Sequence, residues 1–67
     1  MDKQAIARDI KTEFGSGLVN VKQVAQYIGL HRNQIPRFLE GIEYLKFGNQ
    51  RKYTASDIAQ RIIEKKQ

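Results

Sequence analysis

Hydrophobic residues recur at helical spacing near the start of the chain. Ile6, Ile10 and Phe14 follow one another at steps of four, which places them on one face of a helix. Asp2 precedes this stripe as a suitable N-cap residue, and the glycines of 15-GSG-17 favour an end to the helix. The pattern predicts a helix over residues 2–14, followed by a linker.

A second apolar stripe predicts a helix over residues 21–28. Its members lie at i, i+3, i+4 and i+7, and they are Val21, Val24, Ala25 and Ile28. Asn20 is the expected N-cap, and Gly29 is the expected end of the helix. We therefore expect the four apolar side chains to form one buried face.

A third helix is expected to begin near Arg32 or Asn33, because apolar residues resume there and Gly41 supplies a natural end. Its expected inner face consists of Ile35, Phe38 and Leu39. Pro36 is tolerated only in the first turn of a helix, so this helix should start late and be short. Two short helices joined by a glycine-containing turn are typical of a helix-turn-helix.

The rest of the chain predicts a β-hairpin and a last helix. The segment 43-EYLKF-47 alternates and contains β-formers, "GN" at 48–49 suits a tight turn, and 51-RKY-53 forms the returning strand, with Tyr53 in the core. Thr54 caps the last helix, whose apolar residues are Ile58, Ala59, Ile62 and Ile63. We expect a single domain over residues 1–67, mainly α with a small two-stranded hairpin.

Composition excludes several classes of function. The 67 residues include no cysteine and one histidine, His31, so neither a thiolate metal site nor a histidine cluster is expected. No serine or threonine has a histidine base at useful spacing, so we expect neither an enzyme nor a cofactor. The apolar runs reach only two or three residues, which indicates a cytoplasmic protein with no membrane partner.

The net charge of +5 is concentrated in one part of the chain. Residues 1–20 contain three bases and three acids, whereas residues 21–67 contain nine bases and four acids. A neutral start and a basic remainder favour a polyanionic partner. The alternative is that these charges only keep a small domain in solution.

Three groups of polar residues are candidates for contact with DNA. On the outward face of the third helix, where Arg reads guanine edges and Asn or Gln reads adenine edges, the candidates are Arg32, Asn33, Gln34 and Arg37. On the hairpin they are Lys46, Asn49, Gln50, Arg51 and Lys52, and for phosphate near the helix starts they are Asn20, Lys22, Gln23 and His31. The alternative for each group is an ordinary solvated surface.

Residues 18–63 resemble the winged helix-turn-helix of excisionases and MerR-like regulators. The segments that carry the resemblance are "VKQVAQYIGLHRNQIPRFLE" for the helix-turn-helix and "GNQRKYTASDIAQRI" for the wing and the helix after it. Within the second segment, Arg51, Tyr53, Thr54 and Asp57 match the family pattern. The resemblance implies a recognition helix in the major groove of double-stranded DNA, with the wing against the backbone or minor groove.

Two features depart from that family pattern. Pro36 stands where the family has an ordinary helix former, which predicts a shifted or shortened recognition helix. The helix over residues 1–14 is additional to the minimal core, and it either covers the core or serves self-association.

The resemblance also implies a role. Since the sequence shows no long dimerisation helix and no effector domain after Ile63, we expect an excisionase of a phage or mobile element that assists an integrase. A small MerR-like transcriptional regulator has the same expected contacts and remains an alternative. A protein-binding adaptor or inhibitor that uses the basic surface is the third hypothesis.

Overall fold

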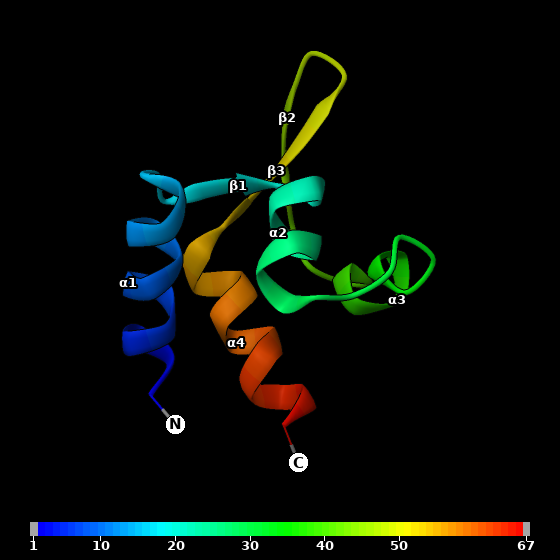
Figure 1. The fold of residues 1–67 in the computed structure, drawn as a ribbon. Coiled ribbons are helices and arrows are strands. Elements are labelled where there is room, and N and C mark those ends of the chain that lie inside the picture. Colours follow the sequence, from blue (N-terminus) through cyan, green and yellow to red (C-terminus); the bar gives the residue numbers. More distant parts are fainter. Residues whose placement is uncertain (1, 67) are drawn as a thin grey trace.

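The computed structural model describes residues 2–66, which form four helices and a three-stranded antiparallel sheet (Figure 1). In chain order the elements are α1 (Lys3–Phe14), β1 (Leu18–Asn20), α2 (Val21–Ile28), α3 (Ile35–Leu39), β2 (Leu45–Phe47), β3 (Gln50–Thr54) and α4 (Ala55–Lys65). The small mixed α/β architecture confirms the predicted order of helices around a hairpin, and it adds one strand.

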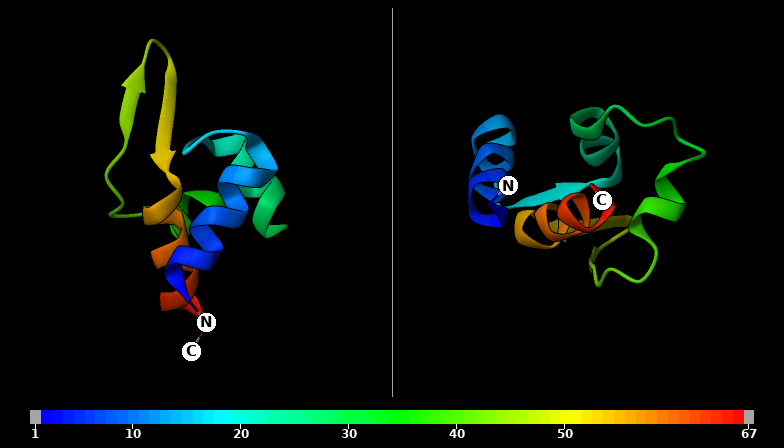
Figure 2. Two further views of the ribbon diagram at one scale, coloured as in Figure 1. Left: turned by 90° about the vertical axis from the view of Figure 1, so that its left-hand side faces the viewer. Right: turned by 90° about the horizontal axis from the view of Figure 1, so that it is seen from below.

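Helix α1 is confirmed as predicted and lies beside α4 (Figures 1 and 2). The Asp2 carboxylate accepts the Gln4 N–H at 3.0 Å and so caps the first turn, and Gly15 ends the helix with φ +68°. Ala7 and Ile10 are buried. One function of α1 is therefore to cover the core, which is one of the two roles expected for it.

The core collects side chains from α1, α2, α3, α4, β1 and β3. Its buried members are Ala7, Ile10, Val19, Val24, Ile35, Phe38, Leu39, Tyr53, Ala55, Ile58 and Ala59. The predicted burial of Val21 is wrong, because this side chain is 37% exposed. Val21 is the first residue of α2 and lines surface hollows, whereas Val24 one turn later points into the core.

The predicted two-stranded hairpin is confirmed as β2 and β3, and β1 adds a third strand that was not predicted. The strand order is β1-β3-β2, so β3 is central, and Val19 pairs with Tyr53. Both of these side chains are buried, at 1% and 3% exposure. A strand of three residues paired with a segment more than thirty residues away leaves no local pattern in the sequence.

Helix α3 begins at Ile35, which makes the expected start near Arg32 or Asn33 wrong by two or three residues. Pro36 occupies the second helical position, where its missing N–H removes no hydrogen bond from the helix. Residues 32–34 form turns instead. The helix is consequently only five residues long.

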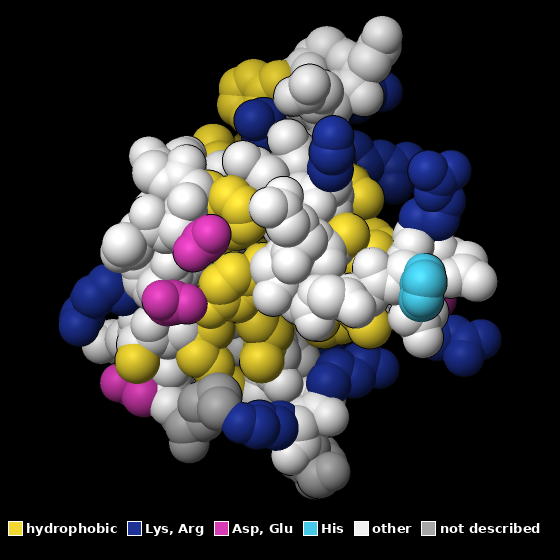
Figure 3. Space-filling view, viewed as in Figure 1, with side chains coloured by type: hydrophobic (Ala, Val, Ile, Leu, Met, Phe, Trp, Pro, Cys, Tyr) yellow, Lys and Arg dark blue, Asp and Glu magenta, His cyan; other side chains and the backbone are white. Residues whose placement is uncertain are grey.

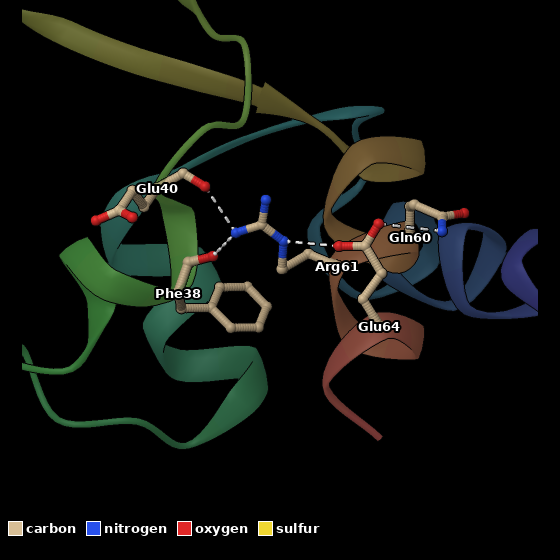
Figure 4. A network of polar contacts seen from close by, with 5 residues as sticks. All are labelled: Phe38, Glu40, Gln60, Arg61 and Glu64. Atoms are coloured by element: carbon tan, nitrogen blue, oxygen red, sulfur yellow. Dashed lines mark hydrogen bonds and ion pairs between the residues drawn. The ribbon is translucent and has the colours of Figure 1, made fainter. Parts of the chain in front are cut away.

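Arg61 of α4 holds the end of this short helix (Figure 4). One guanidinium nitrogen donates to the carbonyl oxygens of Phe38 and Glu40 at 2.6 and 2.8 Å, and Nε pairs with Glu64 at 3.1 Å. These carbonyls lie at the C-terminus of α3, where the helix itself offers no donors. Arg61 therefore fixes the position of α3 relative to α4.

The hairpin β2–β3 projects away from the helices (Figures 1 and 2). Phe47 pairs with Gln50 across the two-residue turn Gly48–Asn49, and Gly48 has φ +61°, a conformation that glycine adopts without strain. The predicted tight turn is confirmed, as is the Thr54 cap of α4, whose hydroxyl oxygen accepts the Asp57 N–H at 3.1 Å. Among residues 2–66, no helix is long and apolar enough to span a membrane.

Candidate nucleic-acid interface

The hairpin concentrates positive charge. Residues 44–54, which we call the basic arm, contain three bases and no acid. Lys46 and Arg51 lie directly opposite each other in the register of β2 and β3. Like charges in that position destabilise a strand pair, so the arrangement is unfavourable for the chain alone and suits an anionic partner.

Two tyrosines organise the arginine of this pair. The Arg51 guanidinium carbon lies 4.9 Å from the centroid of the Tyr44 ring, in cation–π geometry. The Tyr44 ring in turn lies 5.9 Å from the ring of buried Tyr53. The core therefore supports Tyr44, and Tyr44 restricts Arg51 without neutralising its charge.

A groove of about 830 Å³ brings bases from three separate elements together. Lys22 comes from the start of α2, Arg32 from the turn before α3, and Arg51 from β3. Apolar side chains, including Ile35 and Leu39, form part of the lining, and Glu40 is the acid among the lining residues. We call this hollow the arm groove.

A second hollow, of about 470 Å³, extends the arm groove toward the tip of the hairpin. Lys22 and Arg51 line both hollows. The second one adds three predicted contact residues, namely Asn20, Asn49 and Gln50. The arm groove and this second hollow thus share Val21, Lys22 and Arg51 as lining residues.

The bases of this surface are not neutralised within the chain. The side chains of Lys22, Arg32, Lys46 and Lys52 form no hydrogen bond or ion pair with the rest of residues 2–66. Figure 3 shows Lys and Arg side chains around the base of the hairpin and toward α3, whereas most of the Asp and Glu visible on this face lie over α1. The surface around the hairpin and α3 is therefore basic, whereas the surface over α1 carries both signs of charge.

The structure divides the residues predicted for the recognition helix. Asn33, Gln34 and Arg37 line a separate hollow of about 540 Å³ together with Lys65, whereas Arg32 lines the arm groove. Arg37 is the only one of the four that lies on α3. The four residues therefore do not form a single surface that could contact bases. The predicted helix, starting near Asn33, would have placed them on one outward face.

Several predicted contact residues form hydrogen bonds that stabilise the fold. The Asn20 and Gln23 side-chain oxygens accept each other's backbone N–H at 2.7 and 2.9 Å, a reciprocal cap of α2. The Gln34 oxygen accepts the His31 N–H at 3.1 Å and steadies the turn before α3. The contacts of these residues with phosphate or bases stay predictions. Such contacts would use the side-chain NH₂ groups of Asn20, Gln23 and Gln34 and the imidazole of His31, which these hydrogen bonds leave free.

A second group of three bases lies on α1 and offers a comparison. Lys3, Arg8 and Lys11 line a hollow of about 320 Å³ beside Ser56. This group differs from the arm groove because α1 also carries Asp9 and Glu13, and residues 1–20 are neutral in sum. We therefore place the candidate interface on the arm groove and the basic arm.

Sequence reasoning missed three residues that shape the interface. Tyr44 orients Arg51, Glu40 places a negative charge in the arm groove, and Arg61 holds α3. All three act through contacts between residues far apart in the chain or in different elements, so spacing along the sequence carried no signal for them.

Comparison with known proteins found no matching protein family, no similar curated protein and no similar solved structure.

Proposed function

We propose that this chain binds double-stranded DNA through the arm groove and the basic arm. The observation that carries the proposal is the convergence of Lys22, Arg32 and Arg51 from three elements on one groove. Charges that are exposed, unpaired and gathered on one side are the electrostatic pattern of a surface that binds phosphates. The unfavourable Lys46–Arg51 pairing becomes favourable once phosphates lie between or beside the two side chains.

The proposed docking follows a winged helix-turn-helix. Helices α2 and α3 with residues 29–34 correspond to the helix-turn-helix, and the basic arm corresponds to the wing. The major groove, about 12 Å wide, receives α3 with the turn before it, and Arg32 of the turn and Arg37 of the helix approach base edges. The basic arm then follows the backbone toward the adjacent minor groove.

For the biological role, we propose an excisionase that binds near attachment sites and assists an integrase. The support is the resemblance of residues 18–63 to excisionases, carried by Arg51, Tyr53, Thr54 and Asp57. A small transcriptional regulator would use the same surface. The arrangement of binding sites on DNA separates the two roles better than any contact does.

Selection from a random pool of duplexes tests the proposal. The full chain is mixed with the pool at moderate salt, and bound fragments are sequenced after several rounds. Direct repeats about one helical turn apart support cooperative loading by an excisionase. An inverted repeat would replace that role with a dimeric regulator, and a pool without enrichment would contradict sequence-specific binding.

A further inference from the structure

The tip of the hairpin exposes apolar surface that the fold does not use. Phe47 is 56% exposed and Leu45 is 47% exposed, the highest values among the large hydrophobic residues described. Because side chains alternate along a strand, both lie on one face of β2, opposite to Lys46. Phe47 is the last strand residue before the Gly48–Asn49 turn, so it stands at the far end of the projecting hairpin (Figure 1).

The surroundings of Phe47 are basic. The directly opposite residue is Gln50, and the neighbouring cross-strand pairs contribute Lys46, Arg51 and Lys52. Hydrophobic side chains near the upper end of the hairpin lie beside Lys and Arg in Figure 3. An apolar tip within a basic arm suits a partner that offers phosphates outside and an apolar interior, which describes the stacked bases of duplex DNA.

We propose that Phe47 inserts between adjacent base pairs from the minor groove and bends the bound DNA. This inference rests on the proposed function and adds a mechanism to it. Apolar wedges on minor-groove proteins unstack a base step and kink the duplex by roughly 20–90°. Lys46 and Arg51 on one face of the hairpin and Lys52 on the other neutralise the phosphates that the bend brings toward the arm.

The shape of the arm fits this mode. A two-stranded ribbon is wider than the minor groove, which measures about 6 Å, so the tip must enter first. Gly48 has no side chain and is surrounded by open space, so one of the two turn residues adds no bulk to the tip. Phe47 is therefore the large apolar side chain nearest to the point of entry.

The test measures bending and binding in one titration. A duplex selected by the wild-type chain carries a donor dye at one end and an acceptor at the other, and 2-aminopurine replaces one base at the candidate step. We expect wild type to raise energy transfer and to brighten 2-aminopurine. Phe47→Ala should abolish both signals and weaken binding by no more than about tenfold, since the apolar gain is partly offset by the cost of unstacking.

Two further variants sharpen the result. Leu45→Ala removes a comparable apolar side chain from the same face of the same strand but away from the tip, and it should retain bending. Phe47→Trp introduces the only tryptophan of the chain. Its fluorescence should be quenched on DNA that contains the site, because stacking with bases quenches indole emission.

Several outcomes would overturn the proposal. Equal bending by wild type and Phe47→Ala, with binding retained, rejects the wedge and leaves the proposed function intact. An absence of DNA binding by wild type rejects the proposed function, and the wedge with it. If Phe47→Ala instead converts a DNA-free dimer into a monomer in sedimentation, the tip is a surface for self-association.

Discussion

The helical layer of α1 and α4 and the basic arm use charged residues in opposite ways. In the helical layer, Asp2 caps α1, and Arg61 binds two carbonyl oxygens and a carboxylate. In the basic arm, Lys46 faces Arg51, and neither has an acidic partner among residues 2–66. The same residue types thus stabilise the fold in one region and leave free charge in the other.

Burial differs between the two regions in the same direction. Ile10 of α1 and Ile58 of α4 are each 1% exposed, whereas every residue of β2 is exposed. A hairpin without a packed face contributes little stability by itself. We infer that the helical layer with β1 and the base of β3 carries most of the stability, and that the outer arm contributes little to it.

The largest expected effect comes from the helical layer. Ile10→Ala should lower the free energy of unfolding by about 2–5 kcal/mol, because it leaves a cavity at a fully buried position. Chemical denaturation monitored by circular dichroism measures the loss. The contrasting variant Leu45→Ala, in the exposed β2, should change the free energy of unfolding by less than about 1 kcal/mol. Equal losses for the two variants would contradict the inference that the helical layer carries more of the stability than the outer arm.

Arg61→Ala should follow in size. It removes the nitrogen that donates to the Phe38 and Glu40 carbonyls. The free energy of unfolding should fall by about 1.5–3 kcal/mol, the range for a hydrogen bond that involves a charged group. Arg61→Lys restores the charge but not the planar donor geometry, so it should recover only part of the stability. Full recovery by lysine would show that Arg61 acts through charge alone.

Tyr27 of α2, which donates a hydrogen bond to Asp9 of α1, gives the stability of the fold a dependence on pH. Burial raises the pKa of Tyr27 to about 12, helped by its hydrogen bond to Asp9 at 2.5 Å and by the negative charges of Asp9 and Glu13. Because this pKa lies above the unfolded value of 10.0, the associated stability is complete below pH 10 and is lost as pH rises toward 12.

The test compares wild type with Tyr27→Phe, which cannot ionise. The difference between their unfolding free energies should shrink by up to about 2 kcal/mol from pH 9 to pH 12. This is less than the free-energy equivalent of the full pKa shift, because Tyr27 is partly exposed to solvent. Denaturation curves at several pH values give this difference. A difference that stays constant would mean that neither burial nor the Asp9 contact raises the pKa of Tyr27 in solution.

The smallest stability change is expected in the basic arm, with the opposite sign. Lys46→Glu replaces a like-charge pair with an attractive one opposite Arg51, so stability should rise by about 0.2–1 kcal/mol while DNA affinity falls. Lys3→Glu on α1 is the matched control, since it makes the same change in net charge. Equal loss of DNA affinity in both variants would argue that only total charge matters.

The sequence predicted most elements because their signals are local. Asp2, Asn20 and Thr54 each cap the helix that was expected after them, and Gly48–Asn49 forms the expected turn. Each of these features depends on residues within a few positions of one another, so periodicity and capping rules were sufficient.

The failures in the sheet and in the predicted recognition helix involve a distant contact and the proline. Strand β1 exists because Val19 meets Tyr53, and no pattern near residue 19 announces that partner. Pro36 correctly predicted a late, short helix, but the exact start at Ile35 moved Asn33 and Gln34 off the helix and separated Arg32 from Arg37. The basic residues of the arm groove were thus named from the sequence, whereas their grouping required the structure.

The most direct test of the account compares two triple variants that have the same net charge. One replaces the arm-groove bases Lys22, Arg32 and Arg51 with glutamine, and the other does so for Lys3, Arg8 and Lys11 of α1, which leaves +2 of the formal +5 in each. Fluorescence anisotropy over a range of salt concentrations gives the slope of log K against log salt. The account predicts that the arm-groove variant loses about 0.9 of slope for each lost phosphate contact, while the α1 variant keeps the wild-type slope. Equal loss of slope in both variants would contradict a DNA interface at the arm groove.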